Sequence, residues 1–140
     1  MNLYICNMIQ KDSIIALATP SGIGAISVIR ISGEDAIDIL SNFFISKSGK
    51  LLENQKTHTI HLGSIINNSQ IIDEVLVSVF KTPRSYTGEN VVEISCHGSS
   101  FIQQEIIQLF LQNGCRMADN GEFTMRAFLN GKMDLSQAEA

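Results

Sequence analysis

Short β-branched runs separated by polar turns dominate residues 13–97 of this 140-residue chain. Such runs favour strands, because branched side chains pack well on a pleated surface. The runs at 57–65 and 71–81 are joined by Asn67-Asn68-Ser69 and predict a β-hairpin. We expect further strands at 13–19, 24–32 and 91–97, and a short one at 115–118.

Helical spacing of apolar residues is confined to a few segments. Residues 36–44 follow Ser32, which we expect to cap a helix there. A second helix is expected to open near Ser99 and to end at Gly114. Asp134 with Gln137 is typical of a capping box at the start of a final helix, inside which the sequence stops. Strands and helices without a regular βαβ rhythm predict an α+β fold, a mixed sheet with packed helices.

Composition excludes several classes of protein. The chain is 44% hydrophobic, enough for a core, and 17% charged, too little for a disordered chain. A net charge of −4 argues against a broad nucleic-acid-binding surface. Three scattered cysteines without a CxxC pair indicate a reducing intracellular compartment. No apolar run approaches the ~20 residues of a membrane helix, so we expect a cytoplasmic protein without membrane contact.

The nucleotide-binding motifs that we searched for are incomplete. Gly49-Lys50 and Gly131-Lys132 lack the first glycine of a P-loop and the hydroxyl residue after lysine, so this chain alone should not hydrolyse GTP. Gly22-Ile23-Gly24 precedes a strand instead of a helix and is interpreted as a turn. Residues three apart or adjacent on a strand diverge, which argues against a zinc site from His58 with His61 or from Cys96 with His97.

Two charged residues interrupt otherwise apolar strands. Arg30 lies within VIRIS and Glu93 within VVEIS. A buried charge is costly unless it is paired, so each needs a partner, a ligand or a water-facing position. Arg30 can contact a ligand or pair with Glu93. Lys132 follows the Asn130-Gly131 loop and suits either an anionic ligand or solvent. Arg126 and Asp134 are interpreted as a structural pair or as support for a pocket.

Three segments follow the pattern of one known family in its order. They are ATPSGIGAISVIRISG at 18–33, SYTGENVVEISCHG at 85–98 and GEFTMRAFLNGKMDLSQAEA at 121–140. From about Asp12 onward the chain resembles the N-terminal region of the tRNA modification GTPases of the MnmE (TrmE) family. It departs from the family pattern at Ile23, Ser99, Asn120 and Met125.

The resemblance implies a ligand, its binding residues and a domain layout. The expected fold is similar to the folate-binding domain of the glycine-cleavage T protein. The ligand is 5-formyltetrahydrofolate or 5,10-methylenetetrahydrofolate, with Arg30, Glu93 and Lys132 as the binding residues and no catalytic or metal-binding residue. A carboxylate at 93 suits the paired N–H groups of a pterin. We expect an extension at 1–11, a folate-binding and dimerisation domain at 12–120, and the start of a helical domain at 121–140.

The resemblance also implies partners. The full protein forms a homodimer and, with flavin-dependent MnmG (GidA), modifies C5 of the wobble uridine at tRNA position 34 with an aminomethyl or carboxymethylaminomethyl group. GTP, Mg²⁺ and K⁺ belong to a GTPase domain that this sequence lacks. Two alternatives stay open: a structural dimerisation module without ligand, and an aminomethyltransferase-like folate enzyme.

Overall fold

A seven-stranded mixed sheet organises the residues that the computed structural model describes, 12–20, 24–134 and 136–137. Its strand order is β3-β4-β5-β6-β2-β1-β7, in which only the β1–β7 pairing is parallel. The strands are β1 (Ser13–Leu17), β2 (Ile26–Ser32), β3 (Phe44–Ser46), β4 (Thr59–Asn67), β5 (Gln70–Phe80), β6 (Val91–His97) and β7 (Cys115–Met117). The sheet and its packed helices confirm the predicted α+β class.

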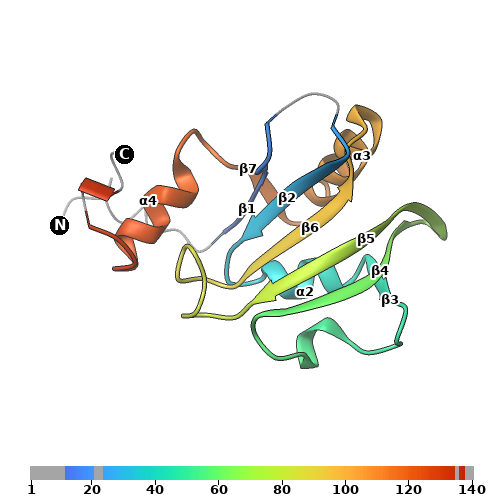
Figure 1. The fold of residues 1–140 in the computed structure, drawn as a ribbon, viewed down its shortest axis with the longest axis horizontal. Coiled ribbons are helices and arrows are strands. Elements are labelled where there is room, and N and C mark those ends of the chain that lie inside the picture. Colours follow the sequence, from blue (N-terminus) through green and yellow to red (C-terminus); the bar gives the residue numbers. More distant parts are fainter. Residues whose placement is uncertain (1–11, 21–23, 135, 138–140) are drawn as a thin grey trace.

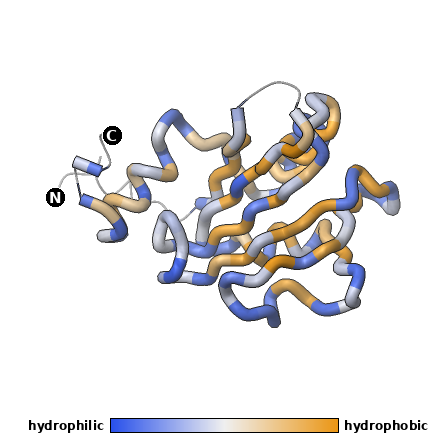
Figure 2. Tube along the Cα trace, viewed as in Figure 1, coloured by the Kyte–Doolittle hydropathy of each residue, from blue (hydrophilic) through white to orange (hydrophobic). Residues whose placement is uncertain are grey.

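Helices cover one face of this sheet. The helical segments are α2 (Ala36–Ser41), the 3₁₀ turn η1 (Leu52–Asn54), α3 (Ser100–Leu111) and α4 (Glu122–Leu129). In Figure 1, α2 and α3 lie behind the sheet, and α4 lies beyond its left end. Figure 2 shows hydrophobic residues concentrated in the strands and in α2 and α3. Their apolar side chains meet the sheet in one core, which includes Ile29, Ile94 and Phe110.

Alternation along the strands determines what lies on the other face. In β2, Ser27, Ile29 and Ile31 are buried, whereas Ile26 is exposed and Arg30 is half-buried. We call the side opposite α2 and α3 the open face.

The β4–β5 hairpin, β6, α3 and β7 confirm the corresponding predictions, although β7 ends at Met117, one residue earlier than expected. The hairpin turns through Asn68 and Ser69, both with positive φ. Ser99 caps α3 by accepting from the Ile102 N–H, and Gly114 follows the helix with φ +112°. The predicted turn at 22–24 lies largely outside the described residues.

The first helix was predicted with the wrong limits. Ser32 does not cap it, because Ser32 remains in β2, paired with Val91 on one side and Ile14 on the other. The helix begins at Ala36 after Asp35, without a side-chain cap. It ends at Ser41, since Phe44 pairs with Ile65 in the β3–β4 ladder. In both places strand pairing overrides the local helical pattern.

No helix among the described residues is long and apolar enough to cross a membrane.

Two phenylalanines of α3 provide a test of this core. Phe110 is fully buried and packs edge-on against Phe43, while Phe101 is 72% exposed. Phe110→Ala leaves a cavity and should lower the free energy of unfolding by about 3–5 kcal/mol. Phe101→Ala should change it by less than about 0.5 kcal/mol. Urea denaturation measures both, and equal losses would contradict the placement of α3.

Candidate functional site

The charged residues of the two apolar strands face each other across the sheet. Arg30 in β2 and Glu93 in β6 are direct partners in the antiparallel register. Arg30 Nε and Nη2 donate to Glu93 Oε2 at 3.0 and 2.8 Å. Both side chains are 25% exposed and lie on the open face. Of the roles considered from sequence, pairing of Arg30 with Glu93 is the one that the structure shows.

Glu93 keeps one carboxylate oxygen for another donor. Both bonds from Arg30 end on Oε2, and no residue that the structure describes donates to Oε1. The site therefore presents an acceptor on a side chain whose orientation is already fixed.

Two aromatic rings lie close to the Arg30 guanidinium. Its central carbon lies 5.3 Å from the centroid of Tyr86 and 5.4 Å from that of Phe123, within cation–π range. Tyr86 belongs to the loop at 82–90, and Phe123 belongs to α4. The Tyr86 hydroxyl is 2.9 Å from Thr124 Oγ1, which joins the loop to the helix.

Sequence reasoning did not assign these two aromatic residues to the site. Tyr86 and Phe123 approach Arg30 only through the fold, from 56 and 93 residues along the chain. Their only signal was membership of the two segments, 85–98 and 121–140, that carry the family pattern.

Lys132 approaches the same loop from the end of α4. Its backbone N–H donates to Ala127 O at 2.8 Å, and the residue is exposed. A Cβ placed on Gly88 would lie 3.4 Å from Lys132 Cγ and 2.9 Å from Asn130 Cβ. Gly88 also has φ +84°, so a glycine both permits the turn and admits these neighbours. Lys132 thus lies beside the loop that carries Tyr86, while only Arg30 and Glu93 contact each other directly.

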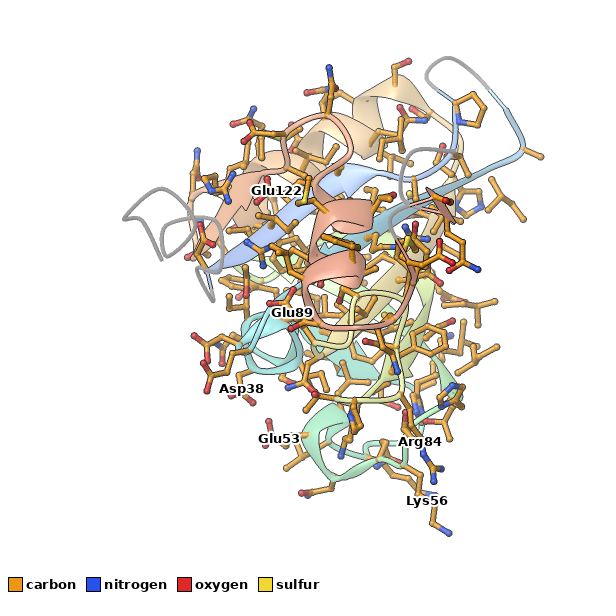
Figure 3. The ribbon with its side chains drawn as sticks, turned by 90° about the vertical axis from the view of Figure 1, so that its left-hand side faces the viewer. Asp38, Glu53, Lys56, Arg84, Glu89 and Glu122 are labelled. Carbon is orange, nitrogen blue, oxygen red and sulfur yellow. The ribbon has the colours of Figure 1, made fainter. Side chains whose placement is uncertain are left out.

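Arg126 is a buried centre of hydrogen bonding next to this loop. It binds Glu89 in the loop, Glu122 in its own helix and Asp12 before β1. In Figure 3, Glu89 and Glu122 lie beside α4, which is in front. Of the two roles expected for Arg126 and Asp134, the direct pair is wrong, because Asp134 instead forms the expected capping box with Gln137.

A second arginine, Arg116, binds two of the carboxylates that contact Arg126. Arg116 donates to Asp12 at 2.8 Å and to Glu122 at 2.7 and 3.0 Å. Its hydrogen bond holds the pKa of Asp12 below the ordinary value, although partial burial opposes this. Burial also acts to raise the pKa of Glu122, but hydrogen bonds from Arg116 and the Asp119 N–H bring it below its usual range.

Two cysteines and a histidine among the described residues lie apart from this cluster. Burial raises the pKa of the Cys96 thiol to about 11 and that of Cys115 to about 12, so both are poor nucleophiles. Cys96 is buried and His97 exposed, which confirms that they diverge. His97 Nδ1 is 2.7 Å from the carboxylate of Asp73. Within the described ranges, no three His, Cys, Asp or Glu side chains are arranged to hold a metal ion.

The open face continues beside the charged pair as a shallow apolar groove. Its volume is about 210 Å³, and its lining includes Ile26, Leu62, Leu76 and Ser95. Leu62, Leu76 and Ser95 are consecutive partners across β4, β5 and β6, with Ser95 two residues beyond Glu93.

A family model and several relatives agree on one family for this chain. Residues 13–132 match the family described as the GTP-binding protein TrmE N-terminus. The chain is similar to the tRNA modification GTPase MnmE of Flavobacterium johnsoniae, with 68% identity over 95% of this chain. It is 65% identical over 95% of its length to the protein of the same name from Flavobacterium psychrophilum, and 59% identical over 94% to that from Bacteroides thetaiotaomicron. The chain covers only 28%, 29% and 28% of these relatives' lengths.

The acidic cluster should make stability depend on pH. The carboxyl groups of Asp12 and Glu122 have lowered folded-state pKa values, so their contribution is present above their unfolded values, about 4. It is lost as the pH falls through the lower folded values. Arg116→Gln removes the hydrogen bonds that lower both pKa values. The stability gap between wild type and this variant should therefore be largest above about pH 5 and shrink below about pH 3.

Urea midpoints across this pH range measure the gap. Lys47→Gln, which removes a more exposed ion pair with Glu74, controls for the loss of one positive charge. A gap for Arg116→Gln that stays constant from pH 7 to pH 2.5 would contradict the assignment.

Proposed function

Since the chain belongs to the TrmE N-terminal family, we propose that it is the tetrahydrofolate-binding and dimer-forming part of a GTPase that modifies tRNA. The ligand we propose is 5-formyltetrahydrofolate or a related one-carbon form. Within the whole protein, this region supplies the folate site for modification at C5 of the wobble uridine. The domain layout proposed is an extension at 1–11, the folate domain at 12–120 and the start of a helical domain at 121–140.

The Arg30–Glu93 pair is the observation that carries this proposal. A pterin presents an amino group and a ring N–H side by side, and a carboxylate accepts such a pair of donors. Among the described residues, none donates to Glu93 Oε1. Arg30 holds the carboxylate in place by two hydrogen bonds to Oε2. Tyr86 and Phe123 add flat apolar surfaces beside it, as binding of a ring system requires.

Lys132 suits the opposite end of such a ligand. A folate ends in a glutamate tail, and an exposed ammonium on a flexible stem attracts carboxylates without requiring one geometry. Its position beside Gly88 places it next to the loop that also carries Tyr86. The proposed assignment is therefore Glu93 and Arg30 at the pterin and Lys132 at the tail.

The remaining functions are proposed for the whole protein. GTP hydrolysis, with Mg²⁺ and K⁺, is assigned to a domain outside this sequence. Modification of tRNA is assigned to a complex with flavin-dependent MnmG. The names of the relatives, tRNA modification GTPase MnmE, support this reading.

The open face supports the proposed homodimer. It exposes Ile26 (65%), Ile60 (65%), Leu62 (43%) and Leu76 (45%), an unusual gathering of aliphatic side chains on one side of a sheet. A second copy placed on this face would shield them in a symmetric contact. The folate site lies on the same face, so the partner would also approach the ligand.

Glu93→Gln tests the ligand assignment while keeping the shape of the side chain. Loss of the charged acceptor should weaken binding of 5-formyltetrahydrofolate at least tenfold, or about 1.4 kcal/mol, in isothermal titration calorimetry. Glu105→Gln, an exposed residue of α3, should leave affinity unchanged. Affinity of Glu93→Gln within twofold of wild type would remove Glu93 from the site. No heat from the folded wild type at millimolar ligand would favour the ligand-free structural module.

Light scattering tests the dimer. The wild-type chain should have the mass of two copies at micromolar concentration. Leu76→Arg places a charge in the middle of the open face and should shift the mass to one copy. Phe101→Arg, on the exposed side of α3, should leave the dimer intact. A monomeric wild type, or a dimer disrupted only by Phe101→Arg, would contradict the proposed interface.

A further inference from the structure

We propose that Arg126 is a positioning residue, whose buried guanidinium fixes the 82–90 loop against α4 and so holds Tyr86 and Phe123 around Arg30. The consequence for ligand affinity rests on the proposed folate function. The consequence for the position of Tyr86 does not, because it concerns the protein without ligand.

The contacts of Arg126 join three distant segments. Its side chain is 5% exposed. Nη1 donates to the Glu89 carboxylate at 3.0 and 3.2 Å and to the Asp12 carbonyl at 2.7 Å. Nη2 donates to the Asp12 carboxylate at 2.7 Å and to Glu122 at 3.3 Å. A buried guanidinium needs such partners, and removing it leaves their charges uncompensated.

Glu89 carries this connection into the loop. Its carboxylate also accepts from Ser32 Oγ at 2.9 Å, and Ser32 Oγ is 2.7 Å from Thr87 Oγ1. The Glu89 carbonyl accepts a short hydrogen bond from Ser85 Oγ. Tyr86 lies between Ser85 and Thr87, and both of these residues make the hydrogen bonds just described. The backbone of Tyr86 is therefore held on both sides. Through Glu89, Arg126 fixes the part of the loop that presents the Tyr86 ring.

The same helix carries the second ring. Phe123 precedes Arg126 by three residues in α4, so both lie on one side of the helix. Tyr86 is linked to the neighbouring Thr124 through its hydroxyl, and Asn130 donates to Thr87 O at 2.8 Å. Loop and helix therefore meet as one unit, in which Arg126 supplies the charged contact.

Arg116 is a matched control within the same cluster. It binds Asp12 and Glu122, as Arg126 does, but it makes no contact with Glu89. Replacing Arg116 therefore disturbs both shared carboxylates without releasing the loop. A difference between the two arginines isolates the connection through Glu89.

Fluorine NMR reports on Tyr86 directly. The chain has two tyrosines, Tyr4 and Tyr86, so 3-fluorotyrosine labelling of a Tyr4→Phe background leaves Tyr86 as the single probe. Arg126→Gln should move this resonance toward that of the unfolded chain, and Arg116→Gln should leave it in place. Glu89→Gln, which keeps Arg126 but weakens its link to the loop, should reproduce the shift if Arg126→Gln fails to fold. An unmoved resonance in folded Arg126→Gln, or in Glu89→Gln where Arg126→Gln does not fold, would overturn the proposal.

Calorimetry with 5-formyltetrahydrofolate tests the second consequence, at a temperature where every variant is folded. Arg126→Gln, or Glu89→Gln in its place, should weaken binding at least tenfold, and Arg116→Gln less than twofold. Unchanged affinity in the first variant would overturn a positioning role for the site. Absence of binding by the wild type would refute the proposed function alone, and the resonance of Tyr86 would then decide the role of Arg126.

Discussion

The pairing register between β2 and β6 is the constraint on which the candidate site depends. It places Arg30 directly opposite Glu93 and, at the adjacent positions, Ile29 opposite Ile94 in the core. Side chains alternate between the two faces of a strand, so a slip of one residue would turn Glu93 into the core and Ile94 toward water. Burial of the aliphatic side chains stabilises this register, and the register in turn fixes the charged pair on the open face.

The parts of the fold that local patterns specify were predictable from the sequence. β-Branched runs joined by a polar turn identified the hairpin strands, and the serine before α3 and the glycine after it marked the ends of that helix. The limits of α2 were missed because Ser32 and Phe44 are held by partners elsewhere in the sheet. The spacing of apolar residues in a segment indicates the local preference for helix or strand. It carries no information about a distant strand that pairs with the same residues.

The same distinction explains what was found and missed at the site. Arg30 and Glu93 were identifiable because a charge inside an apolar strand is anomalous in its own segment. Tyr86 and Phe123 are ordinary within theirs, and only the fold brings them to the guanidinium. The partners of Arg126 were likewise beyond sequence reasoning, since Asp12 and Glu89 lie 114 and 37 residues away.

Burial separates the roles of the two arginine–carboxylate pairs. Arg30 and Glu93 are each 25% exposed, so water can replace part of either contact and a ligand can share the carboxylate at modest cost. Arg126 is 5% exposed, and parting it from Glu89 would leave two poorly solvated charges. The first pair can therefore admit a further donor at the second oxygen of Glu93, whereas the second pair is suited to remain closed.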